Sequence, residues 1–502
     1  MAAAQTAAGG GAVTSVGNSA LYVGGNSERL SRAGMSGTAT TWTASFWVYR
    51  GGERGITGAR FMFTTSSDGG LSFANNSTAD VLAWYSGSYT STTNLFRDIG
   101  WYHMVVKSVA GSGTVYVNGE IVLSGLTVNG ADATMAIGSY NNGSNFLDGY
   151  MAEWVFIDGT AYNPTSFAEY DSTGLFWSPL TSATIKELTF GNNGFYLDNT
   201  TNAETDASGE GNNFTNTNTV TTTTHTPSNL NAVWNPLSAV GLSTRFPLLT
   251  IGNTKAGWTG STSGRAMPTF PVSFNTHLEF TVTQGSGGST AYPYLQVFDY
   301  DGDPAYTALV SQPAAGGTNQ SGLASGASLP NWTTGDRVTL EIDTANGRIY
   351  VWIDGSAVNS ANPGAGSGYT FDFTMPASGN LAIAWINQTS AGFTTIVSNP
   401  DDFTDSVSSG YYGLTSTTIA DQTTRTASDT NKYFQTTLYE GNGAGQRVGA
   451  FQPFDSTFTV GNSSLGSASG ANFTRGSMSG TTTTWTFSAW VKRSEPSVGV
   501  TD

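Results

Sequence analysis

The chain alternates between hydrophobic and polar residues in short runs that are separated by turns. Trp42, Ala44 and Phe46, for example, recur at every second position and so share one face of a strand. The same alternation predicts strands over residues 45–50, 60–64, 81–85, 102–107, 114–117, 134–138 and 151–157. We expect one short helix in this region, over residues 164–170, with Asn163 as its cap. Closely spaced strands with almost no helix predict an antiparallel β-sandwich or jelly roll.

A second region of regular alternation lies in the middle of the chain. Residues 334–355 read as a strand, a turn at Asn346-Gly347, a second strand and a further turn at Asp354-Gly355. Asn-Gly favours the tight turn of a hairpin because both residues tolerate positive φ. The pattern predicts a second all-β domain.

One of the strand segments occurs twice. Residues 32–50 and residues 475–493 are identical at about two thirds of their aligned positions, and their separation is far too long for a solenoid or propeller unit. We therefore expect a domain of one type, a different domain after it, and the start of a further domain of the first type. Because half a sandwich cannot bury its apolar face, either the chain continues past Asp502 or another subunit covers its last strands.

Length and composition fit several β-domains. The 502 residues exceed the roughly 250 to 300 at which a single core stops growing. Only 11% of the residues are charged and 12% are aromatic, and Gly, Thr, Ser and Asn are abundant, which is typical of many short strands and tight turns. The lack of Cys excludes a disulfide scaffold, thiolate metal sites and a cysteine nucleophile.

Charge and hydropathy disfavour two kinds of partner. The formal charge is −16 and no run of Lys or Arg occurs, whereas nucleic-acid binding needs a basic face. No window of 18 residues is apolar throughout, and the first residues resemble no signal peptide, so we expect no membrane insertion.

The most specific motif lies in the first region. Trp101-Tyr-His103 opens one strand, and the next strand ends in Tyr116-Val-Asn118-Gly119. This pairing resembles the laminin G-like, or concanavalin A-like lectin, domain, in which a Trp-x-His strand precedes a strand that ends Tyr-Val-Asn-Gly. The segment from Phe146 to Gly159 resembles the closing strands of that family. The resemblance covers residues 15–180 and implies a lectin-type sandwich, but one fold hosts many functions.

The middle region resembles a different family. Its Gly335-Asp336 start, the strand end at Asp343 and the Gly-marked second strand recur in this order in the SPRY-type sandwich. Between the two regions, the segments around Phe190 and Asp206 resemble a layout found in virion structural proteins of marine tailed bacteriophages. In those proteins, lectin-like domains are strung together with a second type of β-sandwich.

These features predict tandem antiparallel β-sandwiches in six parts. The parts are an N-terminal arm (1–14), a laminin G-like lectin sandwich (15–180), a polar connector (181–242), a SPRY-like sandwich (243–424), a linker (425–455) and the start of a second laminin G-like domain (456–502).

The residues give little reason to expect an enzyme. Glycoside hydrolases need two carboxyl groups about 5 to 9 Å apart, and the nearest string is Glu204-Thr-Asp206-Ala-Ser-Gly-Glu210. Its spacing is wrong, and a solvated turn explains it better. His103, His225 and His277 lie in separate segments, and the chain contains no Gly-x-Ser-x-Gly or His-Glu-x-x-His motif.

Calcium is the only cofactor for which we find candidates. Asp299, Asp301 and Asp303 resemble the start of an oxygen-ligand loop, although the acid expected at its end is replaced by Val310 and a plain acidic turn is the competing interpretation. Laminin G-like domains often hold calcium at a loop rim, so the resemblance adds Asp148 and Asp158 as weak candidates.

Sugar binding needs an exposed aromatic ring and amide or hydroxyl groups at a loop rim. Two segments have this chemistry, and their candidate residues are Trp84, Tyr85, Tyr140, Asn141, Asn142 and Asn145. Strand alternation buries one of Trp84 and Tyr85. Core aromatic residues and a polar hairpin loop are the competing interpretation for both segments.

We therefore expect a phage virion structural protein without enzymatic activity. Its leading role is that of a tail fibre or appendage component on the particle surface, assembled in the bacterial host cytoplasm and binding host-surface polysaccharide. Its other partners would be virion proteins, including copies of itself, with a trimer as the common form of phage fibres. An architectural or capsid-decorating protein is the alternative, and a polysaccharide depolymerase comes third.

Overall fold

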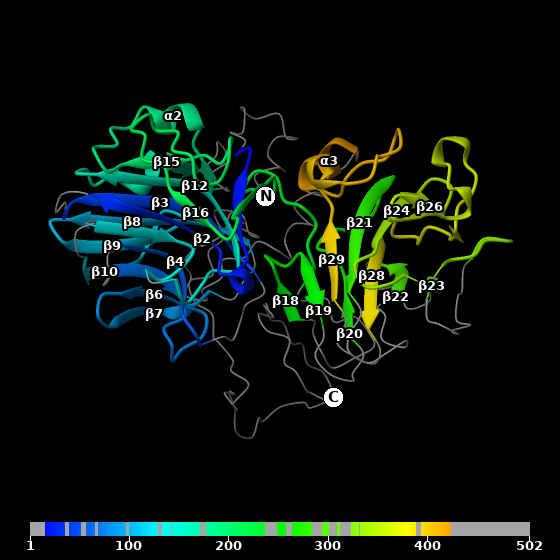
Figure 1. Ribbon diagram of the computed structural model, residues 1–502, viewed down its shortest axis with the longest axis horizontal. Helices are drawn as coiled ribbons and strands as arrows, with labels where there is room; N and C mark the ends of the chain where they lie inside the picture. The colour runs from blue at the N-terminus through cyan, green and yellow to red at the C-terminus, as the bar shows by residue number, and fades with distance from the viewer. Residues whose placement is uncertain are drawn as a thin grey trace, which may run out of the picture.

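Two β-sandwiches lie side by side in the computed structural model of the chain (Figure 1). The structure describes residues 16–422 except for gaps at 36–39, 52–56, 66–68, 97–99, 129–132, 142, 171–176, 236–247, 258–263, 284–293, 301–308, 312–322, 331 and 388–392. The predicted arm (1–14), linker (425–455) and final domain start (456–502) lie outside the described residues. The predicted fold class, all-β with antiparallel sheets, is confirmed.

The first sandwich consists of two antiparallel sheets. Sheet I has the order β10 (Glu120–Thr127), β9 (Ser112–Val117), β8 (Gly100–Val109), β3 (Trp42–Arg50), β12 (Gly149–Asp158), β1 (Ser19–Tyr22) and β17 (Thr221–Thr223), with β15 (Phe195–Leu197) also beside β12. Sheet II has the order β16 (Thr215–Thr217), β2 (Arg29–Met35), β11 (Ala133–Ile137), β4 (Arg60–Thr65), β5 (Gly69–Phe73), β6 (Val81–Tyr85) and β7 (Tyr89–Leu95). All the strands predicted for this region are present.

The hydrophobic face predicted for β3 forms the core between these sheets. Trp42 and Phe46 are fully buried. Phe46 stacks on Trp154 with ring centroids 5.1 Å apart, and Phe63 of sheet II meets Trp154 edge-on at 5.4 Å. Such aromatic pairs each contribute about 0.5–1.5 kcal/mol beyond the burial of their area. The core therefore fixes sheet II, whose outer face carries the candidate site, against sheet I.

The polar connector predicted for residues 181–242 adds structure to this sandwich. It begins with α2 (Ser182–Lys186), and its strand β15 pairs with β12. Strand β16 then extends sheet II beside β2, and β17 extends sheet I beside β1. Strands β16 and β17 are rich in Thr and Asn and lack alternation, so they form because the edges of the two sheets offer them backbone partners.

The helix predicted over residues 164–170 is wrong. A single 3₁₀ turn, η3 (Pro164–Ser166), is followed by β13 (Ala168–Tyr170), which pairs with β14 (Trp177–Pro179). The Asn163 side chain caps no helix, because its Oδ1 accepts a hydrogen bond from Lys107 Nζ at 2.9 Å. Tertiary pairing thus overrides the local helix signal.

The second sandwich also has two antiparallel sheets. Sheet III has the order β18 (Leu248–Thr250), β19 (Lys255–Gly257), β29 (Phe393–Val397), β21 (Thr276–Thr283), β24 (Arg337–Asp343), β25 (Arg348–Ile353) and β26 (Ser356–Ala357), with β27 (Phe371–Asp372) also beside β25. Sheet IV has the order β20 (Gly264–Ala266), β28 (Leu381–Asn387), β22 (Tyr294–Asp299) and β23 (Leu309–Ser311). The predicted hairpin with its turn at Asn346-Gly347 is confirmed as β24 and β25.

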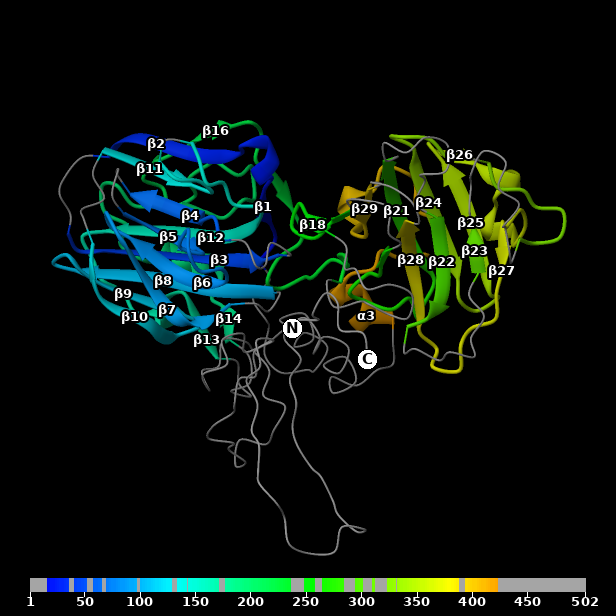
Figure 2. The same ribbon diagram turned by 90° about the horizontal axis from the view of Figure 1, so that it is seen from below.

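The two sandwiches share a continuous buried interface. Tyr49 and Tyr150, on the outer face of sheet I, belong to the same buried cluster as Trp234 and the core of the second sandwich. Figure 2 shows β18 reaching toward the first sandwich, and the turn after β18 packs Gly252 against the Tyr150 ring. Separating the sandwiches would expose these aromatic faces, so experiments on function need the full chain.

In the part of the chain that the structure describes, no helix is both long enough and apolar enough to cross a membrane. The longest described α-helix, α3, covers only Ser416–Gln422.

Candidate functional site

Three tyrosines meet on the outer face of sheet II. Tyr85 and Tyr89 have ring centroids 4.9 Å apart, and Tyr140 lies 5.9 Å from Tyr85. Phe61, which is buried, forms the floor, 5.0 Å from Tyr140 and 6.3 Å from Tyr85. We call Tyr85, Tyr89 and Tyr140 the tyrosine patch. Each of the three side chains is half-buried, so ring surface remains accessible to solvent.

The backbone places these rings through two turns. Tyr85 and Tyr89 face each other as a cross-strand pair where β6 turns into β7, and Gly87 supplies the positive φ of 77° that the turn needs. Tyr140 opens a short loop that is closed by a hydrogen bond from its backbone N to the carbonyl O of Ser144 at 2.8 Å. This loop is tied to β4, because Phe61 N donates to Asn145 O at 3.1 Å.

Hydroxyl and amide groups surround the rings. Asn76 Nδ2 donates to Tyr89 Oη at 3.2 Å, while Asn76 Oδ1 accepts from Ala59 N at 2.9 Å. Burial raises the pKa of Tyr89, and the neighbouring hydroxyls of Tyr85 and Tyr140 raise it further. Asn76 and Asn145 are exposed, so the patch offers aromatic faces together with neutral hydrogen-bonding groups.

The structure brings together part of the predicted glycan-binding set. Tyr85 and Tyr140 meet as described, Asn145 is exposed at the end of the Tyr140 loop, and Asn141 is half-buried in that loop. Asn142 lies outside the described residues. Trp84 must be corrected: it is 1% exposed, and its Nε1–H donates to Thr127 O at 3.0 Å within the core. Alternation, which predicted that one of Trp84 and Tyr85 is buried, thus selects Tyr85 for the surface.

Sequence reasoning missed Tyr89 and Asn76. The sequence did contain a signal for Tyr89, because a hairpin turn at Ser86-Gly87-Ser88 places Tyr89 opposite Tyr85 on the neighbouring strand. No local pattern indicates Asn76, which reaches the patch from the loop between β5 and β6.

The calcium candidates are engaged by donors of the protein itself. Asp148 Oδ2 accepts from Ile251 N at 3.1 Å across the interface between the sandwiches. Asp158 Oδ2 accepts from Asn193 Nδ2 at 2.9 Å, and Asp299 Oδ1 accepts from Ser378 Oγ at 2.6 Å. Asp301 and Asp303 lie outside the described residues. Within the described ranges, no three His, Asp or Glu side chains group as metal ligands.

A Ser–His contact in sheet I lacks the arrangement of a catalytic dyad. Ser45 Oγ lies 2.8 Å from His103 Nε2, and Trp177 Nε1–H donates to His103 Nδ1 at 3.0 Å. Since Nδ1 accepts, neutral His103 carries its proton on Nε2 and donates it to Ser45, so it cannot act as the base for that hydroxyl. Burial lowers the pKa of His103 to about 3, in agreement with a neutral ring.

The carboxylates of the connector are also structural. Asp206 Oδ1 accepts from Tyr196 N at 2.9 Å and from Ser208 N at 2.8 Å, and Glu204 Oε2 accepts from Asn216 Nδ2 at 3.0 Å. Glu153 is different, because it lies buried at a bulge of β12 with Tyr196 Oη donating to its Oε2. Burial raises the pKa of Glu153 to about 7. The neighbouring buried carboxylate, Asp198, accepts a hydrogen bond from Lys186 Nζ at 3.1 Å, so both carboxyl groups have structural partners within the protein.

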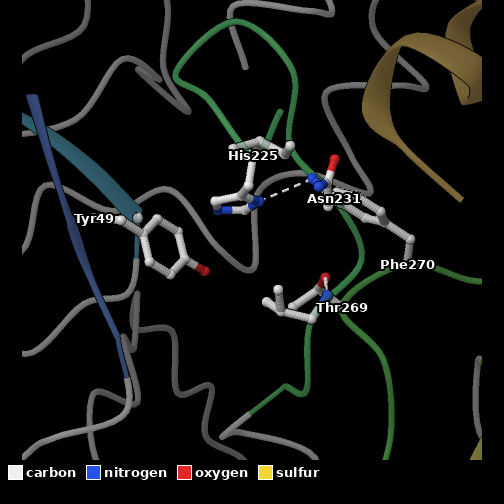
Figure 3. Close-up of a pocket in the computed structure, with 8 residues that line it drawn as sticks. Tyr49, His225, Asn231, Thr269 and Phe270 are labelled. Atoms are coloured by element: carbon white, nitrogen blue, oxygen red, sulfur yellow. Dashed lines mark hydrogen bonds between the residues drawn. The ribbon is translucent and has the colours of Figure 1, made fainter. Parts of the chain in front are cut away.

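A small pocket lies at the interface between the sandwiches (Figure 3). Its lining includes Tyr49, His225, Asn231 and Phe270, and His225 Nδ1 accepts from Asn231 N at 3.0 Å. Burial lowers the pKa of His225 to about 3, so the ring is neutral. The space is too small for a sugar ring, and the candidate site is the tyrosine patch because of its converging, partly exposed rings.

Comparisons with known proteins agree with the fold of the first sandwich. Residues 23–166 match the family described as the concanavalin A-like lectin/glucanases superfamily. No curated protein sequence matches the chain. The first sandwich is therefore a concanavalin A-like lectin domain in fold.

Three solved structures are similar to parts of the chain at low sequence identity. One is a putative carbohydrate binding protein from Bacteroides ovatus, with 16% identity, a TM-score of 0.32 and coverage of 42% of this chain and 60% of that one. A second is a SAP-like pentraxin from Limulus polyphemus, with 16% identity, a TM-score of 0.23 and coverage of 30% of this chain and 80% of that one. A third is the SPRY domain of human HERC1, with 12% identity, a TM-score of 0.23 and coverage of 32% of this chain and 96% of that one. The chain thus spans less than two thirds of the Bacteroides protein.

Proposed function

We propose that the chain binds glycans through the tyrosine patch of its lectin-like sandwich. The observation that carries this proposal is the convergence of Tyr85, Tyr89 and Tyr140, with centroid distances of 4.9 and 5.9 Å, beside the exposed amides of Asn76 and Asn145. The apolar face of a sugar ring packs on such rings, while its hydroxyls pair with amide and phenol groups.

The patch suits weak and shallow binding. It lies on the outer face of a sheet, where the three tyrosines remain partly accessible to solvent. Single contacts of this kind become effective when several copies act together, because linkage raises avidity by about 10² to 10⁴ without any new contact. A homo-oligomer, such as a trimer, would provide these copies.

We place this activity in a phage virion structural protein, as a tail fibre or appendage component that recognises host-surface polysaccharide. The support is the resemblance of the segments around Phe190 and Asp206 to marine phage virion proteins. Other virion proteins would be its structural partners. The proposal includes no catalytic step and no bound cofactor, in keeping with the protonation of His103 and with the protein donors that engage Asp148 and Asp158.

An architectural or capsid-decorating role is the second candidate. The observation in its favour is the continuous buried cluster that joins the sandwiches into one unit, as a rigid spacer requires. A depolymerase has less support, because the candidate connector acids Glu204 and Asp206 accept hydrogen bonds from the protein itself.

The test is binding of the labelled full chain to candidate host cells and to a polysaccharide array. Tyr140→Ala is expected to weaken binding about tenfold, since it removes one stacking face and one hydroxyl. Tyr89→Phe keeps the ring and removes the hydroxyl, so it should cost less. The matched control is Tyr412→Ala, which removes an exposed tyrosine (39% exposed) from the second sandwich.

Three outcomes separate the candidates. Binding that falls with Tyr140→Ala but not with Tyr412→Ala supports the glycan-binding proposal, and loss of binding on chelation would add calcium to it. An unchanged binding curve for Tyr140→Ala, or no binding by the full chain, contradicts the proposal and leaves the architectural role. Shortening of the polymer by the purified protein would establish the enzyme instead.

A further inference from the structure

We infer that the tyrosine patch takes a glycan that carries an oxyanion, such as a carboxylate or a sulfate, and that Arg29 binds this group. The inference rests on the proposed function, because it concerns the same site. It adds the charge class of the ligand, which neutral tyrosine and asparagine side chains do not set.

Arg29 reaches the site through the loop that carries Tyr140. Its neighbour Leu30 is fully buried in the core, so alternation along β2 turns Arg29 to the outer face of sheet II. The guanidinium lies against Gly143, where an added Cβ would come within 3.1 Å of Nη1 and 3.2 Å of Cζ. Gly143 N donates to Tyr140 O at 2.8 Å, so Arg29 and Tyr140 flank the same short loop.

Arg29 differs from the paired arginines Arg50 and Arg337 in its partners. Arg50 pairs with Asp80 at 2.8 Å, and Arg337 pairs with Asp405 at 2.5 Å. Arg29 is half-buried but forms no ion pair with any carboxylate of the described residues. A partly desolvated guanidinium without an anion is a ready donor, and its planar fork fits a carboxylate or sulfate with two parallel hydrogen bonds.

The charge around the patch favours such a ligand despite the acidity of the whole chain. The net charge is −16, but repulsion from distant carboxylates is screened over about 8 Å at physiological ionic strength. The tyrosine patch and the residues named beside it, Phe61, Asn76 and Asn145, contain no acidic side chain. Arg29 therefore gives the patch a local positive charge.

The experiment measures binding of the full chain to three polymers: polygalacturonate, dextran sulfate and neutral dextran. We expect one of the charged polymers to bind at least about tenfold more tightly than dextran, and Arg29→Gln to remove this preference. Arg29→Lys keeps the positive charge but lacks the planar guanidinium group, so this variant should retain part of the preference for the charged polymer. The matched control is Arg348→Gln, which removes the same charge from the second sandwich. An unchanged melting temperature shows that each variant is folded.

The results distinguish failure of this inference from failure of the proposed function. Preference for polygalacturonate or for dextran sulfate identifies the oxyanion as carboxylate or sulfate. Equal binding of all three polymers, or a preference that Arg29→Gln leaves intact, overturns the inference, and the proposed function stands if Tyr140→Ala still weakens binding about tenfold. Absence of binding to every polymer overturns both.

Discussion

Replacing Glu153 by Gln is expected to remove a fall in stability between about pH 4.5 and pH 7. Glu153 is buried at the bulge in β12, where sheet I meets the connector strand β15, and burial raises its pKa to about 7 from the ordinary 4.5. Its backbone has a positive φ of 51°, which Gln adopts as readily as Glu. Gln can also accept the hydrogen bond that Tyr196 Oη donates. The substitution therefore removes the ionisation and little else.

The direction and size of this change in the free energy of unfolding follow from proton linkage. The folded state holds the proton more tightly than the unfolded state, so the stabilisation is complete below pH 4.5 and is lost as the pH rises through about 7. A shift of about 2.5 pKa units corresponds to about 3 kcal/mol at 1.36 kcal/mol per unit. Above pH 7, wild-type protein must bury a carboxylate that the Gln variant lacks. The variant should then be the more stable of the two by an amount that approaches this figure.

The assay is urea unfolding of both proteins at intervals between pH 5 and pH 8. Other groups titrate in this range: burial lowers the pKa of His277, but hydrogen bonds to Glu279 and Glu341 outweigh this and raise it. The difference between wild type and variant cancels such contributions. Glu169→Gln, at an exposed position of β13, is the control. Parallel curves for wild type and Glu153→Gln would refute the buried, protonated Glu153.

Two further predictions concern buried contacts. Asp80→Asn should lower the free energy of unfolding by about 3–5 kcal/mol in urea, because it leaves Arg50 buried without its ion-pair partner at 2.8 Å. Asn tolerates the positive φ of 62° at this position, so the backbone adds no strain. A loss below about 1 kcal/mol would contradict this prediction. Gly252→Ala should weaken packing at the interface between the sandwiches, because the added Cβ would lie 2.0 Å from Tyr150 Cε2. We therefore expect the two sandwiches of this variant to unfold in separate thermal transitions. Gly379→Ala, also at positive φ but facing open space, should keep one transition, and one transition in both variants would argue against the shared interface.

The fold was predictable wherever local pattern and turn chemistry agree. The face of Trp42 and Phe46, and the hairpin of β24 and β25 around Asn346-Gly347, are encoded in neighbouring residues and appear as expected. Strands β16 and β17 were not predictable, because their Thr- and Asn-rich sequences become strands only beside the edges of other strands. The helix predicted after Asn163 is absent for the same reason, because residues 168–170 form β13 and pair with β14. The three residues of β15 are too few to show alternation.

The candidate site was predictable in part for a similar reason. Alternation identified a surface aromatic residue at Tyr85, and loop composition identified Tyr140 and Asn145. The contact between these two segments depends on Phe61, whose buried ring supports Tyr85 and Tyr140 from a third strand. Asn76 and Arg29 arrive from still other elements, and no sequence spacing relates them to the tyrosines.

The position of the interface bears on how the two candidate roles relate. The second sandwich packs on the outer face of sheet I, through Tyr49 and Tyr150, whereas the tyrosine patch lies on the outer face of sheet II. The core between the sheets separates these two surfaces, so the second sandwich cannot cover the patch. A rigid pair of sandwiches and an open binding face are therefore compatible in one chain. Loss of glycan binding in Tyr140→Ala with an unchanged thermal transition would separate binding from architecture, whereas simultaneous loss of both would mean that the patch supports the fold.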